Sequence, residues 1–263
     1  MVGVLTNAVL LNDDHVEFFK SYEPDYIQIS LYGSDEEGYL RVTGHRGFEK
    51  AVAAIRALTD AGLDVRVVTT PSRYLKEDYL KIVELCKAQK FKFQKGELLL
   101  IANRDDPSKN DYQLTSDELV ELACQREAFY RPLVPKATTP EPCGSCSVIP
   151  QAGLPCSAGR ALAHVTWDGK MYPCANAMVG GASLLDMSYA EAWKITVDAA
   201  SKVQLGVECV GCPYDKTCPK CPSMRLTDLH SGHCNTAICD LTRRMVAAGV
   251  KKLDELSVDP QGL

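Results

Sequence analysis

Short apolar runs alternate with amphipathic segments along the first hundred residues of the chain. The runs predict strands at 2–11, 26–32, 63–70 and 98–102. Between them, apolar residues recur at helical spacing in 13–22, 47–61 and 76–88. Gly62 follows the second of these predicted helices, at the position where a left-handed residue commonly ends a helix. The first run predicts a buried strand.

Strands that alternate with crossover segments of about a dozen residues form parallel sheets with helices outside. The N-terminal part is therefore predicted as an α/β layer or as part of a (β/α) barrel. Further helices are predicted at 116–129, with Thr115, Ser116 or Asp117 as its cap, at 188–202, capped by Ser188, and at 240–256.

A proline-rich stretch predicts the domain boundary. Residues 132–142 contain four prolines, a density typical of an extended, semi-rigid connector. We therefore predict a first domain at 1–131, a linker at 132–142 and a second domain at 143–263.

Composition excludes several classes of protein. The 263 residues carry a net charge of −5 and a pI near 5.6, which argues against a nucleic-acid surface. No apolar run reaches the eighteen or so residues of a membrane span. Twelve cysteines without a secretory signal favour a soluble protein of the reducing cytoplasm. No P-loop, dinucleotide fingerprint or Ser/His/Asp order is present.

Ten of the twelve cysteines lie in the C-terminal part, and they suggest a metal or cluster site. They are Cys143, Cys146, Cys156, Cys174, Cys209, Cys212, Cys218, Cys221, Cys234 and Cys239. Disulfides are the minority interpretation because they belong mainly to secreted chains. Two neighbouring CxxC pairs, 209–212 and 218–221, fit either a zinc site or a [4Fe–4S] ligand set. His230 and His233 beside Cys234 keep a mixed Cys/His zinc site open.

The upstream cysteines flank a predicted hairpin. Cys156 is separated from Gly169 by twelve residues, and Gly169 from Cys174 by four. Alternation in AHVTW, a type I′ turn signal at Asp168-Gly169 and a return strand in KMYPC predict the hairpin. One thiolate thus lies at the start of the hairpin and another at its end.

This order of cysteines and glycine resembles the SPASM domain of radical S-adenosylmethionine (SAM) enzymes, which holds two auxiliary [4Fe–4S] clusters. The resemblance covers Cys156 to Cys239, although two residues separate Cys218 from Cys221 where three are usual. It implies one cluster on Cys156, Cys174 and Cys221 with Cys143 or Cys146. It implies a second on Cys209, Cys212, Cys218 and Cys239, for which Cys234 is a competitor. The two remaining cysteines are then buried thiols.

The N-terminal part resembles the third to fifth βα units of a radical SAM core. This resemblance rests on TNAVLL, on YIQISLYG, and on a loop with Arg41 that precedes GHRGFEKAVAAIRALTDAGLDVRVVTT. It implies that Ser30 and Arg41 approach the amino-acid end of SAM. The CxxxCxxC loop of the family is absent from the 263 residues, so SAM chemistry is expected only if a missing N-terminal part is supplied. Residues 2–11 would otherwise form an exposed sheet edge, and Cys86 and Cys124 are expected in the core.

The combined expectation is a partial (β/α) barrel of a radical SAM core followed by a small cysteine-rich SPASM domain with a hairpin and helices. The resemblance implies an oxidoreductase of the peptide- or protein-modifying maturase type, forming thioethers or formylglycine. Its expected partners are a peptide or protein substrate and an electron donor such as a flavodoxin or ferredoxin, with no nucleic acid and no membrane. Two alternatives stay open: a stand-alone iron–sulfur electron-transfer or scaffold protein, and a structural zinc-binding module.

Overall fold

Four short strands form a parallel sheet in the N-terminal part of the computed structural model. They are β1 (Gly3–Thr6), β2 (Tyr26–Ser30), β3 (Val65–Thr69) and β4 (Lys92–Lys95), and their order in the sheet is the order in the sequence. All three strand pairs are parallel. The predicted parallel sheet is confirmed.

The structure describes residues 2–95, 112–130, 153–154, 156–175, 177–203, 212–214, 217–218 and 236–252. The chain divides into two compact units. Described residues up to 130 belong to the first unit, and those from 153 onward belong to the second. The predicted linker at 132–142 and the predicted strand at 98–102 lie outside the described residues.

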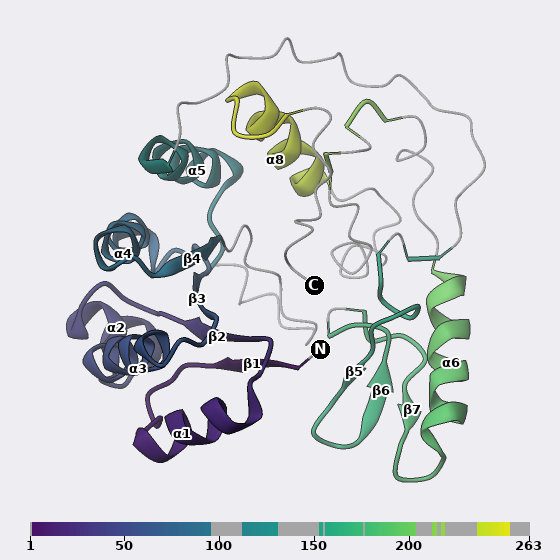
Figure 1. The fold of residues 1–263 in the computed structure, drawn as a ribbon. Coiled ribbons are helices and arrows are strands. Elements are labelled where there is room, and N and C mark those ends of the chain that lie inside the picture. The colour runs from purple at the N-terminus through teal and green to yellow at the C-terminus, as the bar shows by residue number, and fades with distance from the viewer. Residues whose placement is uncertain are drawn as a thin grey trace. The chain divides into compact units, whose positions relative to one another are not determined.

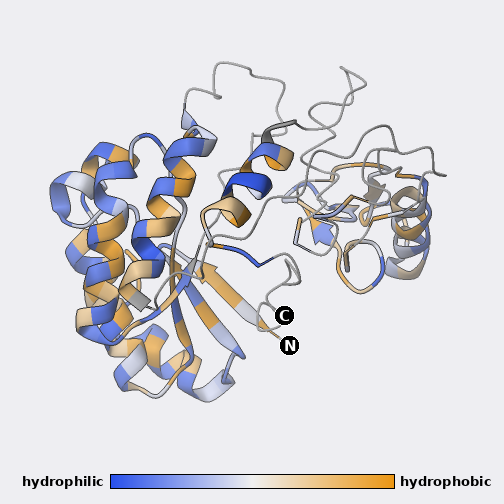
Figure 2. Cartoon of the chain, turned by 90° about the horizontal axis from the view of Figure 1, so that it is seen from above, coloured by the Kyte–Doolittle hydropathy of each residue, from blue (hydrophilic) through white to orange (hydrophobic). Residues whose placement is uncertain are grey.

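Helices cover one side of the parallel sheet, as Figure 1 shows. They are α1 (Asp13–Tyr22), α2 (Glu36–Thr43), α3 (Phe48–Asp60), α4 (Lys76–Gln89) and α5 (Ser116–Tyr130). In Figure 2 these helices carry both apolar and polar residues. Such amphipathic helices bury one stripe against the sheet and leave the other in water.

The core of the first unit lies between the sheet and its helices. Ile27 and Ile29 of β2 and Val65 and Val67 of β3 are buried there. They pack with residues of α3 and α4, including Ala51, Ile55, Leu58, Ile82 and Cys86. Cys86 is fully buried in this core, as expected, and burial raises the pKa of its thiol to about 12. Cys124 of α5 is only half-buried.

Three details of the first unit differ from the prediction. The β1 strand is not buried: its side chains alternate between exposed and half-buried, and Leu5 is 66% exposed, because β1 pairs with β2 alone at the edge of the described sheet. The segment with Arg41 is the helix α2, not a loop. Finally, β4 was missed, because KFQK mixes two lysines with one aromatic residue and lacks an apolar run.

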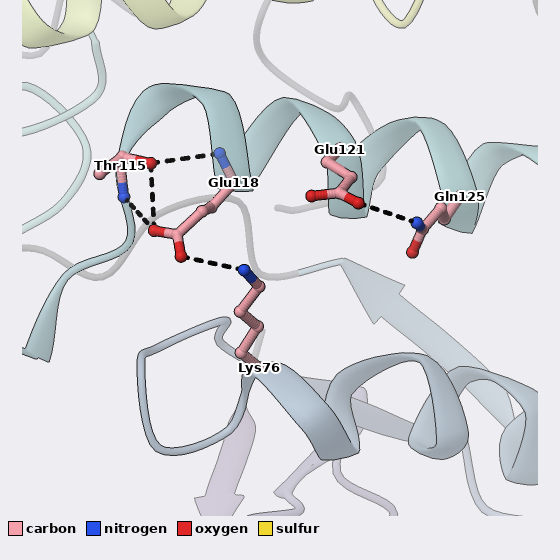
Figure 3. A network of polar contacts seen from close by, with 5 residues as sticks. All are labelled: Lys76, Thr115, Glu118, Glu121 and Gln125. Carbon is pink, nitrogen blue, oxygen red and sulfur yellow. Dashed lines mark hydrogen bonds and ion pairs between the residues drawn. The ribbon is translucent and has the colours of Figure 1, made fainter.

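Polar contacts at their N-terminal ends connect α5 to α4 (Figure 3). The Glu118 carboxylate accepts hydrogen bonds from the Thr115 backbone N–H at 2.9 Å and from the Thr115 hydroxyl at 3.0 Å. The Glu118 N–H donates back to Thr115 Oγ1 at 3.3 Å, which completes a capping box. Lys76 of α4 contacts the other carboxylate oxygen at 2.9 Å. Of the three predicted caps, Thr115 is the one used.

We expect the free energy of unfolding to depend on pH through the Glu118 carboxylate. The Thr115 N–H, Lys76 and the Thr115 hydroxyl lower the pKa of Glu118 from 4.5 to about 2. A lowered folded-state pKa contributes stability above pH 4.5, and that stability is lost as the pH falls towards 2. Glu118→Gln should therefore destabilise the chain at pH 7 and make little difference near pH 2, as measured by urea unfolding across that range. Glu121→Gln is the matched control because the Glu121 carboxylate accepts a hydrogen bond from the neutral Gln125 side chain at 3.4 Å (Figure 3). Equal effects of the two variants would contradict the prediction.

The second unit contains a small antiparallel sheet and two described helices. The strands are β5 (His164–Val165), β6 (Lys170–Tyr172) and β7 (Ala182–Ser183), in that order, and the helices are α6 (Tyr189–Lys202) and α8 (Thr236–Ala247). Ser188 caps α6, as predicted, and Glu191 completes a capping box with it. The last helix begins four residues earlier than predicted and ends at Ala247. Here the left-handed Gly249 follows the helix, a signal that the prediction overlooked.

The predicted hairpin is confirmed, but its turn type is not. The Gly169 N–H donates to Thr166 O at 3.0 Å, and the Thr166 N–H donates to Lys170 O at 2.9 Å. Gly169 is left-handed, with φ of 76°, whereas Asp168 is not among the described residues with positive φ. A type I′ turn needs positive φ at both central residues. The observed loop has three residues and ends in a left-handed glycine, the other common hairpin geometry.

In the part of the chain that the structure describes, every helix is too short or too polar to cross a lipid bilayer.

Candidate functional site

The face of the parallel sheet opposite the helices carries polar residues towards the carboxyl ends of the strands. Strand register places Ser30 of β2 beside Val68 of β3, and Val68 beside Gln94 of β4, in one row across the sheet. The Gln94 side-chain oxygen is buried and has no hydrogen-bond partner among the described residues. Ligands of parallel α/β sheets bind at the carboxyl ends of the strands. Ser30, a predicted SAM residue, therefore lies at a suitable place for a ligand.

Arg41, the second predicted SAM residue, lies in the last turn of α2 and pairs with Asp78 of α4. Its guanidinium Nη2 donates to one oxygen of the Asp78 carboxylate. The Asp78 side chain is 3% exposed, whereas that of Arg41 is 47% exposed. A buried carboxylate is thus joined to a cation that also reaches solvent. Among the described residues, no hydrogen bond joins the side chains of Arg41 and Ser30.

Two further residues complete the surroundings of Asp78. The Ser34 hydroxyl, in the loop between β2 and α2, donates to the second carboxylate oxygen. Gly38 of α2 lies directly against the carboxylate, since a Cβ built there would be 2.8 Å from Asp78 Oδ2. Both carboxylate oxygens are therefore hydrogen-bonded, and a larger residue at 38 would collide with them.

Sequence reasoning missed Ser34, Gly38 and Asp78. Asp78 shares the first turn of α4 with the exposed Glu77, and an acid at that position is expected simply from the helix dipole. Nothing in the local pattern separates the two acids, because burial of one of them depends on the position of α2. Gly38 becomes informative only when α2 is known to be a helix, because a glycine inside a helix needs a packing reason.

The described cysteines of the second unit are Cys156, Cys174, Cys212, Cys218 and Cys239. Cys156 is exposed, and the other four are half-buried. Cys156 precedes the hairpin of β5 and β6, and Cys174 follows it directly, as predicted. The predicted ligands Cys143, Cys146, Cys209, Cys221 and Cys234 lie outside the described residues, as do His230 and His233.

The loop that carries Cys156 is held by Arg160. The guanidinium donates to the Cys156 carbonyl at 2.7 Å and 3.0 Å and to the Leu154 carbonyl at 3.0 Å. Cys174 packs against a small cluster that contains Leu154 and Ala158. The two cysteines at the ends of the hairpin thus belong to segments that share one apolar cluster.

A buried threonine fixes the segment that carries Cys218. The Thr217 hydroxyl donates to the Lys252 carbonyl at 2.8 Å, and the Thr217 side chain is buried. The Cys218 N–H donates to the Tyr214 carbonyl at 2.8 Å. This segment therefore packs on residues just beyond α8. Cys239 lies in the first turn of that helix, so the contact alone does not bring Cys239 to Cys218.

No disulfide joins any two of the seven cysteines in the described ranges. Within the same ranges, no three Cys, His, Asp or Glu side chains gather in a way that could hold a metal ion. Five of the ten predicted cysteine ligands lie outside these ranges, so the cluster sites are not tested by this geometry. The donors themselves are soft thiolates, which suit iron–sulfur clusters and zinc.

Comparison with known proteins adds a sequence family and a fold. Residues 1–86 match the radical SAM superfamily. An AdoMet-dependent heme synthase of Methanosarcina barkeri (strain Fusaro / DSM 804) is 22% identical over 242 residues, covering 84% of this chain and 68% of the relative.

Solved structures of similar fold include native anSMEcpe with bound AdoMet, at a TM-score of 0.64 and 16% identity, covering 94% of this chain and 72% of that one. The structure of native anSMEcpe with bound AdoMet and Cp18Cys peptide has a TM-score of 0.66 and 16% identity. The match covers 95% of this chain and 74% of that one. The structure of Streptococcus suis SuiB bound to S-adenosylmethionine has a TM-score of 0.56 and 13% identity. The match covers 80% of this chain and 52% of that one. Residues 1–86 are therefore similar to the radical SAM superfamily, and the fold of the chain is similar to the folds of anSMEcpe and SuiB.

Proposed function

We propose that this chain is part of a radical SAM enzyme that modifies a peptide or protein, and that its second unit binds two auxiliary [4Fe–4S] clusters. The observation that carries the proposal is the cysteine-flanked hairpin in a chain that also contains a radical SAM segment. Cys156 and Cys174 bracket β5 and β6, and the glycine between them turns the chain in the left-handed conformation. The spacing of these three residues is the one that suggests a SPASM domain.

The proposed cluster ligands divide into two sets. Cys156, Cys174 and Cys221 hold the first cluster together with Cys143 or Cys146. Cys209, Cys212 and Cys218 hold the second together with Cys239, or with Cys234 in its place. When bound, the clusters supply one-electron chemistry, and the protein tunes their potential through burial and hydrogen bonds to sulfur.

The first unit contributes the proposed contacts to SAM. Ser30 lies at the end of β2, on the sheet face opposite the helices, and Arg41 lies on the next helix, α2, with its side chain about half exposed. A hydroxyl and a guanidinium suit the carboxylate of an amino acid. Reductive cleavage of SAM would also need the three thiolates of a CxxxCxxC loop, a motif that these 263 residues do not contain.

Peptide substrates are favoured by the solved neighbours. One structure of anSMEcpe contains the bound Cp18Cys peptide together with AdoMet. A flavodoxin or ferredoxin is the proposed electron donor, since the clusters exchange single electrons. The cytoplasm is the proposed compartment, because thiolate ligands need reducing conditions.

A second candidate substrate class comes from the Methanosarcina barkeri relative, an AdoMet-dependent heme synthase. A chain that acts on a heme-type substrate should bind an iron porphyrin, seen as a shift of its Soret absorption. A peptide-modifying chain should leave that absorption unchanged, so one titration separates the two classes.

The cluster assignment is tested with ligand variants. We expect Cys156→Ala to lose about four iron atoms per chain after anaerobic reconstitution, and Cys212→Ala to lose about four from the other cluster. Each single variant should keep the remaining cluster, as measured by iron content and by absorption near 400 nm. Cys86→Ala is the matched control because Cys86 is a buried core thiol of the first unit. Full iron content in both ligand variants would contradict the assignment.

A further inference from the structure

We propose that Asp78 is a positioning residue, which holds the Arg41 guanidinium for the carboxylate of the bound ligand. The inference rests on the proposed function, because it takes the amino-acid carboxylate of SAM as that ligand. Asp78 itself is buried and does not contact the ligand in this proposal. It acts through Arg41, whose side chain is about half exposed.

The first support is the free-energy cost of burying the Asp78 carboxylate. A carboxylate that is 3% exposed is stable only when it is paired and hydrogen-bonded. Here one oxygen accepts from Arg41 and the other from Ser34. Replacing buried ion pairs by apolar groups is often neutral or stabilising, so packing of α2 on α4 does not by itself require a buried charge. The proposed role in holding Arg41 accounts for the charge at this place.

The second support is that Arg41 has donors left. A guanidinium carries five N–H donors in a rigid, planar fork. In the described structure Asp78 engages Nη2, and the exposed part of the side chain reaches solvent. A guanidinium that is already held at one nitrogen loses less conformational entropy when a ligand carboxylate binds its remaining N–H donors. The buried pair thus prepares the exposed donors for an anionic ligand.

The third support is the fixed backbone around the pair. Gly38 packs its backbone on the Asp78 carboxylate, and Gly33 lies against the start of α2, where a Cβ would come within 2.2 Å of Tyr39 N. Ser34 follows Gly33 in the loop that leaves β2 after Ser30. The contact with Asp78 therefore fixes both the loop after Ser30 and the helix of Arg41.

The test compares two nucleosides that differ in the amino-acid part. S-adenosylhomocysteine carries the carboxylate, whereas 5′-methylthioadenosine lacks the whole amino-acid group. Equilibrium dialysis with the full chain should show that Asp78→Asn weakens binding of S-adenosylhomocysteine by about ten-fold or more and leaves binding of methylthioadenosine nearly unchanged. In an Arg41→Gln background, Asp78→Asn should cause no further loss, because its effect passes through Arg41.

Asp64→Asn is the matched control. Asp64 also pairs with two cations, Arg66 at 3.0 Å and Lys92, but it precedes β3 at the amino end of the sheet. This variant should leave the ratio of the two dissociation constants unchanged. Ser34→Ala removes one hydrogen bond from Asp78 without removing the charge, so it provides a milder variant if Asp78→Asn fails to fold. Ser34→Ala should weaken binding of S-adenosylhomocysteine selectively, by about three-fold.

Different outcomes separate the two proposals. Equal weakening for both nucleosides in the Asp78 and Ser34 variants would show a purely structural role and overturn the inference alone. If the unaltered chain binds methylthioadenosine as tightly as S-adenosylhomocysteine, no carboxylate is recognised and the inference is also overturned. If it binds neither nucleoside, both the inference and the proposed SAM contacts are overturned.

Discussion

Replacement of Gly159 by alanine is expected to lower the free energy of unfolding of the second unit by about 3 kcal/mol. Gly159 has φ of 68°, a left-handed conformation that is unfavourable for alanine. A Cβ at this position would also lie 2.3 Å from the Cβ of Ala200 on α6, far inside van der Waals contact. Because Gly159 belongs to the loop after Cys156, the variant should also reduce iron binding at the first proposed cluster.

Two comparisons isolate the steric part of this effect. Gly62→Ala is the matched control: Gly62 is left-handed with φ of 83°, but a Cβ there would meet nothing within 4 Å, so about 1 kcal/mol is expected. Adding Ala200→Gly to Gly159→Ala should recover the steric part. Both tryptophans of the chain, Trp167 and Trp193, lie in the second unit, so their fluorescence during denaturation reports the effect of Gly159→Ala. Far-ultraviolet circular dichroism reports the effect of Gly62→Ala, because Gly62 lies in the first unit. A loss no greater for Gly159→Ala than for Gly62→Ala would contradict the close packing of this loop on α6.

Arg126→Met should destabilise the first unit by about 3–5 kcal/mol. Arg126 of α5 is 5% exposed and pairs with the buried Glu127 at 3.0 Å, and it donates to the Tyr79 hydroxyl of α4 at 3.1 Å. Burial alone would lower the pKa of Arg126, but Tyr79 and Glu127 raise it above its usual value. The variant leaves the Glu127 carboxylate buried without this cation, which is the costly situation for an ion pair.

The double variant Arg126→Met/Glu127→Leu should recover much of the loss, because replacing both charges by apolar groups removes the unbalanced charge. Urea unfolding followed by far-ultraviolet circular dichroism measures these differences. Arg244→Met serves as a control, since Arg244 of α8 makes an exposed ion pair with Asp240 at 2.7 Å and should change stability by less than about 1 kcal/mol. If Arg126→Met lowers the free energy of unfolding no more than Arg244→Met does, then the buried Arg126, with its bonds to Glu127 and Tyr79, does not stabilise the first unit.

Periodicity predicted the parts of the fold that local sequence determines. The helix α3 was clear because five of its residues form one buried stripe and Gly62 follows it. The strands β2 and β3 were clear because each places isoleucine or valine on the buried face. In contrast, β4 has only Phe93 as a strong apolar residue, and it is a strand because it pairs with β3. Its assignment needed the tertiary structure.

The candidate site was predictable only in part. Ser30 and Arg41 were predicted only from the resemblance to a radical SAM core. Strand alternation and the turn signal at Asp168-Gly169 predicted the hairpin between Cys156 and Cys174. Asp78 could not be found, because its importance comes from α2, a helix that begins 42 residues earlier and that was itself predicted as a loop. Buried polar contacts between distant segments leave no periodic signal in either segment.

The most direct test of the proposed function is the metal content of the unaltered chain, purified and reconstituted without oxygen. Iron, acid-labile sulfide and zinc are measured together on protein whose folding is verified by circular dichroism. We expect about eight iron and eight sulfide per chain, as for two [4Fe–4S] clusters, and no stoichiometric zinc. Stoichiometric zinc without sulfide in well-folded protein would contradict the cluster proposal and would establish a structural zinc module instead.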